Sequence, residues 1–206
     1  MIKTKTDLEY YLRKDREMLK VPKQTFYRKV ANLLFPLEIW EFEKTLRYAE
    51  YYNNRDYSFF MAKIMGCILK VLFKYKLRKK SIRLGFDIPI NVFGPGLSIA
   101  HYGSIIVNGS ARIGANCRLH SGVNIGASAG NRDAPQIGDN CYIGPGAILF
   151  GGINIGDNVT IAANATVNRS CIQDNVVLAG TPAKVVKEGA NNWLVFNDIN
   201  HRINIQ

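Results

Sequence analysis

The sequence has few of the residues that build disulfide frameworks and metal centres. Its 206 residues include four cysteines, with no C-x-x-C pair, and three histidines that lie far apart in the chain. Disulfide-rich domains and zinc sites need several such residues at short spacing, so both classes are excluded. We expect reduced thiols and no metal.

Long apolar runs are also missing. The most apolar stretch, residues 59–75, is interrupted by Lys63 and Lys70, and it is shorter than the roughly 20 apolar residues of a membrane span. Residues 1–17 contain no apolar run of the kind that follows the basic start of a secretory signal. We therefore expect a cytoplasmic protein that at most contacts the inner face of the membrane.

Charge and glycine divide the chain near residue 85. Residues 1–84 contain 20 basic and 9 acidic side chains but only one glycine, whereas residues 85–206 contain 7 of each charge and 17 of the 18 glycines. The division predicts a basic α-helical N-terminal region over residues 1–84, a differently built domain over residues 85–189 and a C-terminal tail over residues 190–206.

The basic N-terminal region shows helical spacing of its apolar residues. A capping box at Thr6 and Glu9 predicts the start of its first helix, and Lys63, Lys70 and Lys74 share one stripe of its last helix. A solvated face is the favoured interpretation of this stripe. The alternative is attraction to an anionic membrane or to diphosphate-linked glycan intermediates. Binding of nucleic acid is not expected, because no groove-reading motif is present and aromatic residues do not alternate with basic ones.

A six-residue repeat runs through the glycine-rich part. The ten repeat positions, all aliphatic, are Val107, Ile113, Leu119, Ile125, Ile137, Ile143, Leu149, Ile155, Ile161 and Val167. Short strands of this kind bury an aliphatic face only when coils stack, which predicts a prism-shaped parallel β-helix. Glycine follows the repeat position at 114, 126, 138, 144 and 156, where we expect it to supply the backbone angles of corners.

Three of the four cysteines occupy a small inward position of this repeat. Cys117, Cys141 and Cys171 each lie four residues after an aliphatic repeat position. We interpret them as packing residues rather than nucleophiles, and Cys67 in the helical region receives the same interpretation.

The start and the end of the repeat region carry a recognisable pattern. Gly94-x-Gly96-Leu-x-Ile-x-His101-x-Gly103, the coils, and the closing Ala179-Gly-Thr-Pro-Ala183 resemble the hexapeptide-repeat acyltransferases, in the serine acetyltransferase-like branch found with surface-polysaccharide O-acetyltransferases. The resemblance covers about residues 85–186. It implies a mainly β fold, a left-handed parallel β-helix preceded by a small helical region. It also implies acetyl-CoA as co-substrate and a homotrimer, or a dimer of trimers, with active sites between prisms.

The resemblance gives His101 the role of general base. A neutral imidazole takes the proton of an acceptor hydroxyl as the oxygen attacks a thioester carbonyl. The alternative is a hydrogen-bonded structural histidine at a slip of the repeat, and the residues alone leave both open. Asp87 lies near the place of an acceptor-site aspartate in the family. It would orient His101 or bind the acceptor, or else merely cap a turn.

Residues 127–136 interrupt the repeat and must leave the prism as a loop. The resemblance implies that this loop covers the pantetheine arm of acetyl-CoA and that small residues of neighbouring coils form its groove. The binding positions carried over are Ser128, Arg132, Pro145, Gly146, Ala163 and Lys184. The alternative is a surface loop without a role. His120, roughly one coil above Tyr102, would either touch substrate or be a solvated corner residue.

Two departures from the family pattern bear on the acceptor. Serine acetyltransferases typically have Asp-His where this chain has Ala100-His101, and Arg-His-Pro where it has Asp133-Ala134-Pro135. Because a carboxylate and a second histidine are missing, we predict an O-acetyltransferase that modifies a hydroxyl of a sugar or cell-surface polysaccharide precursor. Alternatives are a serine O-acetyltransferase and, from another class, a non-catalytic β-helix that serves as scaffold or glycan-binding module.

Overall fold

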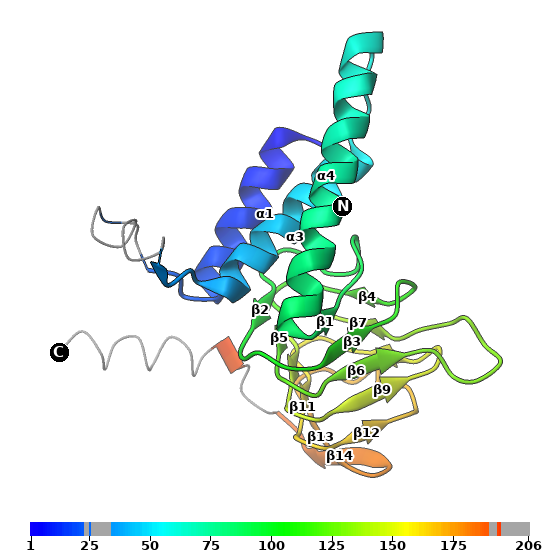
Figure 1. The fold of residues 1–206 in the computed structure, drawn as a ribbon. Helices are drawn as coiled ribbons and strands as arrows, with labels where there is room; N and C mark the ends of the chain where they lie inside the picture. The colour runs from blue at the N-terminus through cyan, green and yellow to red at the C-terminus, as the bar shows by residue number, and fades with distance from the viewer. Residues whose placement is uncertain (23–24, 26–33, 190–192, 195–206) are drawn as a thin grey trace.

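Three helices pack on one end of a prism of short strands (Figure 1). The computed structural model describes residues 1–22, 25, 34–189 and 193–194. The helices are α1 (Lys5–Met18), α3 (Glu38–Asn54) and α4 (Phe60–Leu84). In the described ranges, no helix is both long and apolar enough to cross a membrane.

The prism has three walls, and successive strands visit them in turn. Wall A is the sheet β1-β3-β6-β9-β12, wall B is β10-β7-β4, and wall C is β14-β13-β11-β8-β5-β2. The strands are β1 (Phe86–Asp87), β2 (Ser98–Ile99), β3 (Ile105–Val107), β4 (Arg112–Ile113), β5 (Arg118–Leu119), β6 (Asn124–Gly126), β7 (Gln136–Ile137), β8 (Tyr142–Ile143), β9 (Ile148–Phe150), β10 (Asn154–Ile155), β11 (Thr160–Ile161), β12 (Thr166–Val167), β13 (Val177–Gly180) and β14 (Ala183–Lys187). All pairings are parallel except β13 with β14.

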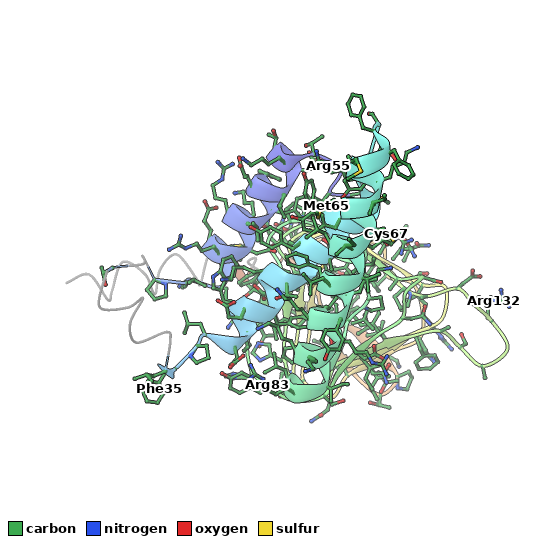
Figure 2. The ribbon with its side chains drawn as sticks, turned by 45° about the horizontal axis from the view of Figure 1, so that its top comes forward. Phe35, Arg55, Met65, Cys67, Arg83 and Arg132 are labelled. Carbon is green, nitrogen blue, oxygen red and sulfur yellow. The ribbon has the colours of Figure 1, made fainter. Side chains whose placement is uncertain are left out.

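The aliphatic repeat forms the axis of the prism. All ten repeat residues are at most 5% exposed, which confirms that they face inward. The cysteines differ in their exposure to solvent. Cys117 and Cys141 are buried, and burial raises the pKa of Cys141 to about 12, so neither is a thiolate nucleophile at neutral pH. The expectation that Cys67 is a packing residue was wrong, because its side chain is exposed on α4 (Figure 2).

The repeated glycines serve close stacking of coils rather than corner angles. None of the five glycines that follow a repeat position, at 114, 126, 138, 144 and 156, has a positive φ, so the expectation that they supply corner angles was wrong. A Cβ on Gly114 would lie 2.7 Å from the backbone carbonyl of Gly138 in the next coil. At the edge between walls B and C, left-handed angles belong to Asn116, Asn140 and Asn158, with φ of 56°, 59° and 57°. Their amide side chains bond in a ladder along the edge between walls B and C, at 2.8 and 3.1 Å.

Helix α1 begins two residues earlier than its predicted capping box. The Thr4 hydroxyl accepts a hydrogen bond from the Asp7 N–H at 3.1 Å, and the Asp7 carboxylate accepts one from the Thr4 N–H at 2.9 Å. The reciprocal pair satisfies donors that a helix start leaves free. The predicted pair at Thr6 and Glu9 therefore falls inside the helix.

A buried arginine side chain joins the helices to the first coil. Arg47 of α3 is fully buried and donates to both carboxylate oxygens of Asp15 (2.6 and 3.2 Å), to Glu50 (3.0 Å) and to the carbonyls of Phe93 (3.0 Å) and Gly94 (2.7 Å). The same Asp15 accepts the backbone N–H groups of residues 96 and 97 at 2.7 and 2.9 Å. The network therefore fixes the backbone that leads into β2.

Helix α4 exposes apolar as well as basic side chains. Met61, Ile68, Val71 and Tyr75 are 55–73% exposed. A solvated basic stripe does not account for this face, because large apolar side chains gain nothing from exposure to water.

Candidate active site

His101 lies on the outside of the prism, at the edge where wall C turns into wall A. It follows β2 and precedes β3, and its side chain is exposed. The inward positions on either side are filled by Ile99 and Ile105, which are fully buried. The structure therefore does not enclose the imidazole in its own coil, and solvent reaches it.

Two further side chains gather beside His101. The rings of His101 and His120 have centroids 5.7 Å apart, and the ring of Tyr142 lies 5.0 Å beyond His120. His120 is half-buried, and burial, followed by the charges of Arg118 and His101, lowers its pKa. His120 is thus neither free in solvent nor remote from the candidate base.

Three of the six predicted cofactor-binding residues share this edge. Pro145, Gly146 and Ala163 follow β8 and β11 at the turns from wall C to wall A. The Gly146 N–H donates to the Ser121 carbonyl at 3.0 Å, and the Asn164 N–H donates to the Pro145 carbonyl at 2.9 Å. These turns stack along the same edge as the turn that holds His101, and Pro145 and Ala163 are exposed there.

Ser128 and Arg132 lie at the other edge of wall A. Their loop follows β6 and projects from the turn between walls A and B, with Arg132 far out on it (Figure 2). At its base, a Cβ on Gly151 would come within 2.8 Å of the Ser128 hydroxyl. Ala134 and Pro135 are buried, so the loop ends before residue 134 rather than at 136. One chain therefore does not bring the loop to His101.

Lys184 and Asp87 also lie apart from this edge. Lys184 is exposed on β14, where it pairs with Ala179 at the far end of wall C. Asp87 is exposed on β1 opposite Ile106. It lines a groove of about 630 Å³ between α4 and wall A, and His101 is not among the lining residues. The predicted roles of both residues remain predictions.

Sequence reasoning missed Tyr142 and Arg118. Arg118 donates to the Ser98 hydroxyl at 2.9 Å, and its guanidinium lies 5.8 Å from the ring centre of Trp193. Both missed residues are outward positions one before an aliphatic repeat residue, so the repeat itself places them on wall C. In the described part of the chain, no three His, Cys, Asp or Glu side chains come together in a way that would hold a metal ion.

The fold has known counterparts. The family model described as bacterial transferase hexapeptide (six repeats) matches residues 134–169. The crystal structure of serine acetyltransferase from Brucella abortus strain S19 superposes with a TM-score of 0.66 at 25% identity, over 89% of this chain and 70% of that one. The predicted fold class, a left-handed parallel β-helix of hexapeptide repeats preceded by a small helical region, is confirmed.

The named relatives are serine acetyltransferases. The one from Mycobacterium tuberculosis (strain ATCC 25618 / H37Rv) is 33% identical over 108 residues, which are 51% of this chain and 47% of that protein. A structure of the Brucella abortus strain S19 enzyme in complex with coenzyme A gives a TM-score of 0.69 at 24% identity, over 91% of this chain and 70% of that one. The chain spans about half the length of the curated relatives it matches.

These comparisons correct the predicted acceptor. The relatives and structural neighbours carry the name serine acetyltransferase, so the prediction of a sugar or polysaccharide hydroxyl was wrong, and the alternative of serine agrees with them. That prediction depended on two missing side chains, at Ala100 and Ala134. A missing group removes one contact but selects no new acceptor.

Proposed function

We propose that this protein is a serine O-acetyltransferase that moves the acetyl group of acetyl-CoA to the hydroxyl of L-serine. The observation that carries the proposal is the exposed His101 on the edge that Pro145, Gly146 and Ala163 continue, in a chain similar to serine acetyltransferases over about half its length.

The chemistry needs one proton carrier. Neutral His101 accepts the proton of the serine hydroxyl while the oxygen attacks the acetyl carbonyl. The tetrahedral intermediate then collapses, the carbon–sulfur bond breaks, and the departing thiolate takes the proton back from the imidazolium. The buried thiols of Cys117 and Cys141 take no part, so transfer is direct.

A homotrimer would complete the site. The His101 edge and the loop edge are the two borders of wall A. If three prisms turn wall A toward a common axis, the His101 edge of one chain meets the loop edge of the next. Ile106 and Ile148 support this arrangement, because both point outward from wall A and are 44% and 42% exposed. The apolar face of α4 supports a further pairing of two trimers.

Charging wall A is expected to separate the subunits. Ile148→Asp should convert the trimer to monomer, because three carboxylates would be buried near the axis without partners. Acetyl transfer should fall at least about tenfold, since each site would lose its loop. Light scattering coupled to gel filtration measures the first effect. Ile172→Asp is the matched control, because Ile172 is 80% exposed and lies outside wall A. An intact trimer in Ile148→Asp contradicts this arrangement.

A free-thiol assay tests the acceptor. With acetyl-CoA present, L-serine should accelerate thiol release, while D-serine and L-alanine, which has no hydroxyl, should leave the background rate unchanged. If no acceptor accelerates thiol release, the alternative of a non-catalytic scaffold is favoured and the proposed function fails. Release that depends on another hydroxyl compound and not on L-serine would overturn serine as the substrate.

A further inference from the structure

His120 occupies a defined place relative to the candidate base. In wall C, Ile99 pairs with Leu119, and Leu119 pairs with Ile143. His120 therefore lies in register between Ala100 below and Gly144 above. These two small residues leave room for an imidazole on the outer surface, next to the turn that carries His101.

The surroundings of His120 lower its pKa and leave one ring nitrogen without a hydrogen-bond partner. The Tyr142 ring lies 5.0 Å from the His120 ring and the His101 ring lies 5.7 Å from it, between centroids, and Arg118 stands two residues earlier in the chain. Burial, followed by the charges of Arg118 and His101, lowers the pKa of His120. The buried Nε2 atom has no hydrogen-bond partner in the described structure, and a buried polar nitrogen normally has one.

We infer that His120 is a positioning residue for His101, and that its Nε2 accepts a hydrogen bond from the ring N–H of His101 once the exposed His101 side chain rotates toward it. The rings do not share this bond in the structure, but their centroid separation of 5.7 Å is only slightly longer than the separation of about 5.3 Å that an in-line N–H···N bond between two imidazoles requires. Such a bond fixes the tautomer in which the other nitrogen of His101 faces the acceptor hydroxyl. In many enzymes a carboxylate fixes the tautomer of the catalytic histidine. The residue before His101 is Ala100, which has no carboxylate. Here the partner comes from the next coil instead. The consequence for catalysis depends on the proposed function, but the hydrogen bond itself does not.

Three substitutions separate hydrogen bonding from packing. His120→Gln keeps an acceptor of similar reach, His120→Phe keeps a ring of similar shape without an acceptor, and His120→Ala keeps neither. If His120 positions the base, Gln should hold kcat for acetyl transfer within about threefold of the parent, while Phe and Ala lower it about 10–100-fold with little change in KM. Rescue by Phe but not by Gln would overturn the inference in favour of packing.

Nitrogen-15 NMR of the full chain tests the bond without any need for activity. The chain has only three histidines, so their ring signals can be assigned from single substitutions. His101 should show one tautomer in the parent and in His120→Gln, and a mixture in His120→Phe. The same tautomer populations in all variants would overturn the inference. If the tautomer responds but no acceptor releases thiol, the proposed function fails while the positioning contact stands.

Discussion

His101→Ala is expected to lower kcat/KM for acetyl transfer by about 10²–10⁴-fold, which is the usual contribution of a positioned general base. His101 is exposed at an edge and fills no core position, so the variant should keep its melting temperature. Binding of coenzyme A should also persist, because the base acts on the acceptor hydroxyl. A thiol-release assay with saturating acetyl-CoA, together with a binding titration, measures both.

Two controls make this result specific. Lys5→Ala removes an exposed side chain of α1, where Lys5 pairs with Glu9 at 3.7 Å, and should leave kcat/KM unchanged. His101→Asn keeps a polar side chain that cannot take up a proton and should be as slow as alanine. Turnover within about threefold of the parent in either His101 variant would remove this residue from the mechanism.

The fold was predictable because the stacking of coils requires an aliphatic residue at every sixth position, and the sequence shows this repeat. Every sixth residue must fill the prism axis, so the ten aliphatic positions identified the walls, and all ten are buried. The reason for the repeated glycines was not predictable. A side chain at position 114 would clash with the coil above because the two backbones lie so close together. The period of the repeat carries no information on that distance. Likewise, the position of Cys67 depends on which face of α4 meets α3.

The candidate site was predictable as a set of positions but not as an arrangement. Period counting places Pro145 and Ala163 at the same kind of turn as His101. It also assigns His120 to a corner, but it does not reveal that His120 lies beside His101, because ring separation depends on the side-chain directions at a bend. Ser128 lies at the other edge of wall A from His101, because the loop that interrupts the repeat departs between β6 and β7. That information appears only once the walls are closed around an axis.

Arg47→Met is expected to be strongly destabilising. Asp15 is 0% and Glu50 2% exposed. The change therefore leaves both carboxylates buried without the guanidinium that pairs with them. Breaking a buried pair in this way costs about 3–5 kcal/mol, a large share of the roughly 5–15 kcal/mol that holds a typical domain folded. Because Asp15 also holds the backbone of residues 96 and 97, acetyl transfer should fall too.

The test of the Arg47 network compares two identical substitutions in different surroundings. Arg83→Met removes the ion pair with Glu38 at the other end of α3, where the Arg83 side chain is 58% exposed, and exposed pairs contribute at most about 1 kcal/mol. Denaturant unfolding should therefore show a loss in Arg47→Met several times that in Arg83→Met. Arg47→Lys should fall between them, because an ammonium has three donors and cannot replace five bonds from a planar fork. Equal losses in the two methionine variants would mean that the buried network contributes no more than a surface pair, and that apolar packing alone holds the helices on the prism.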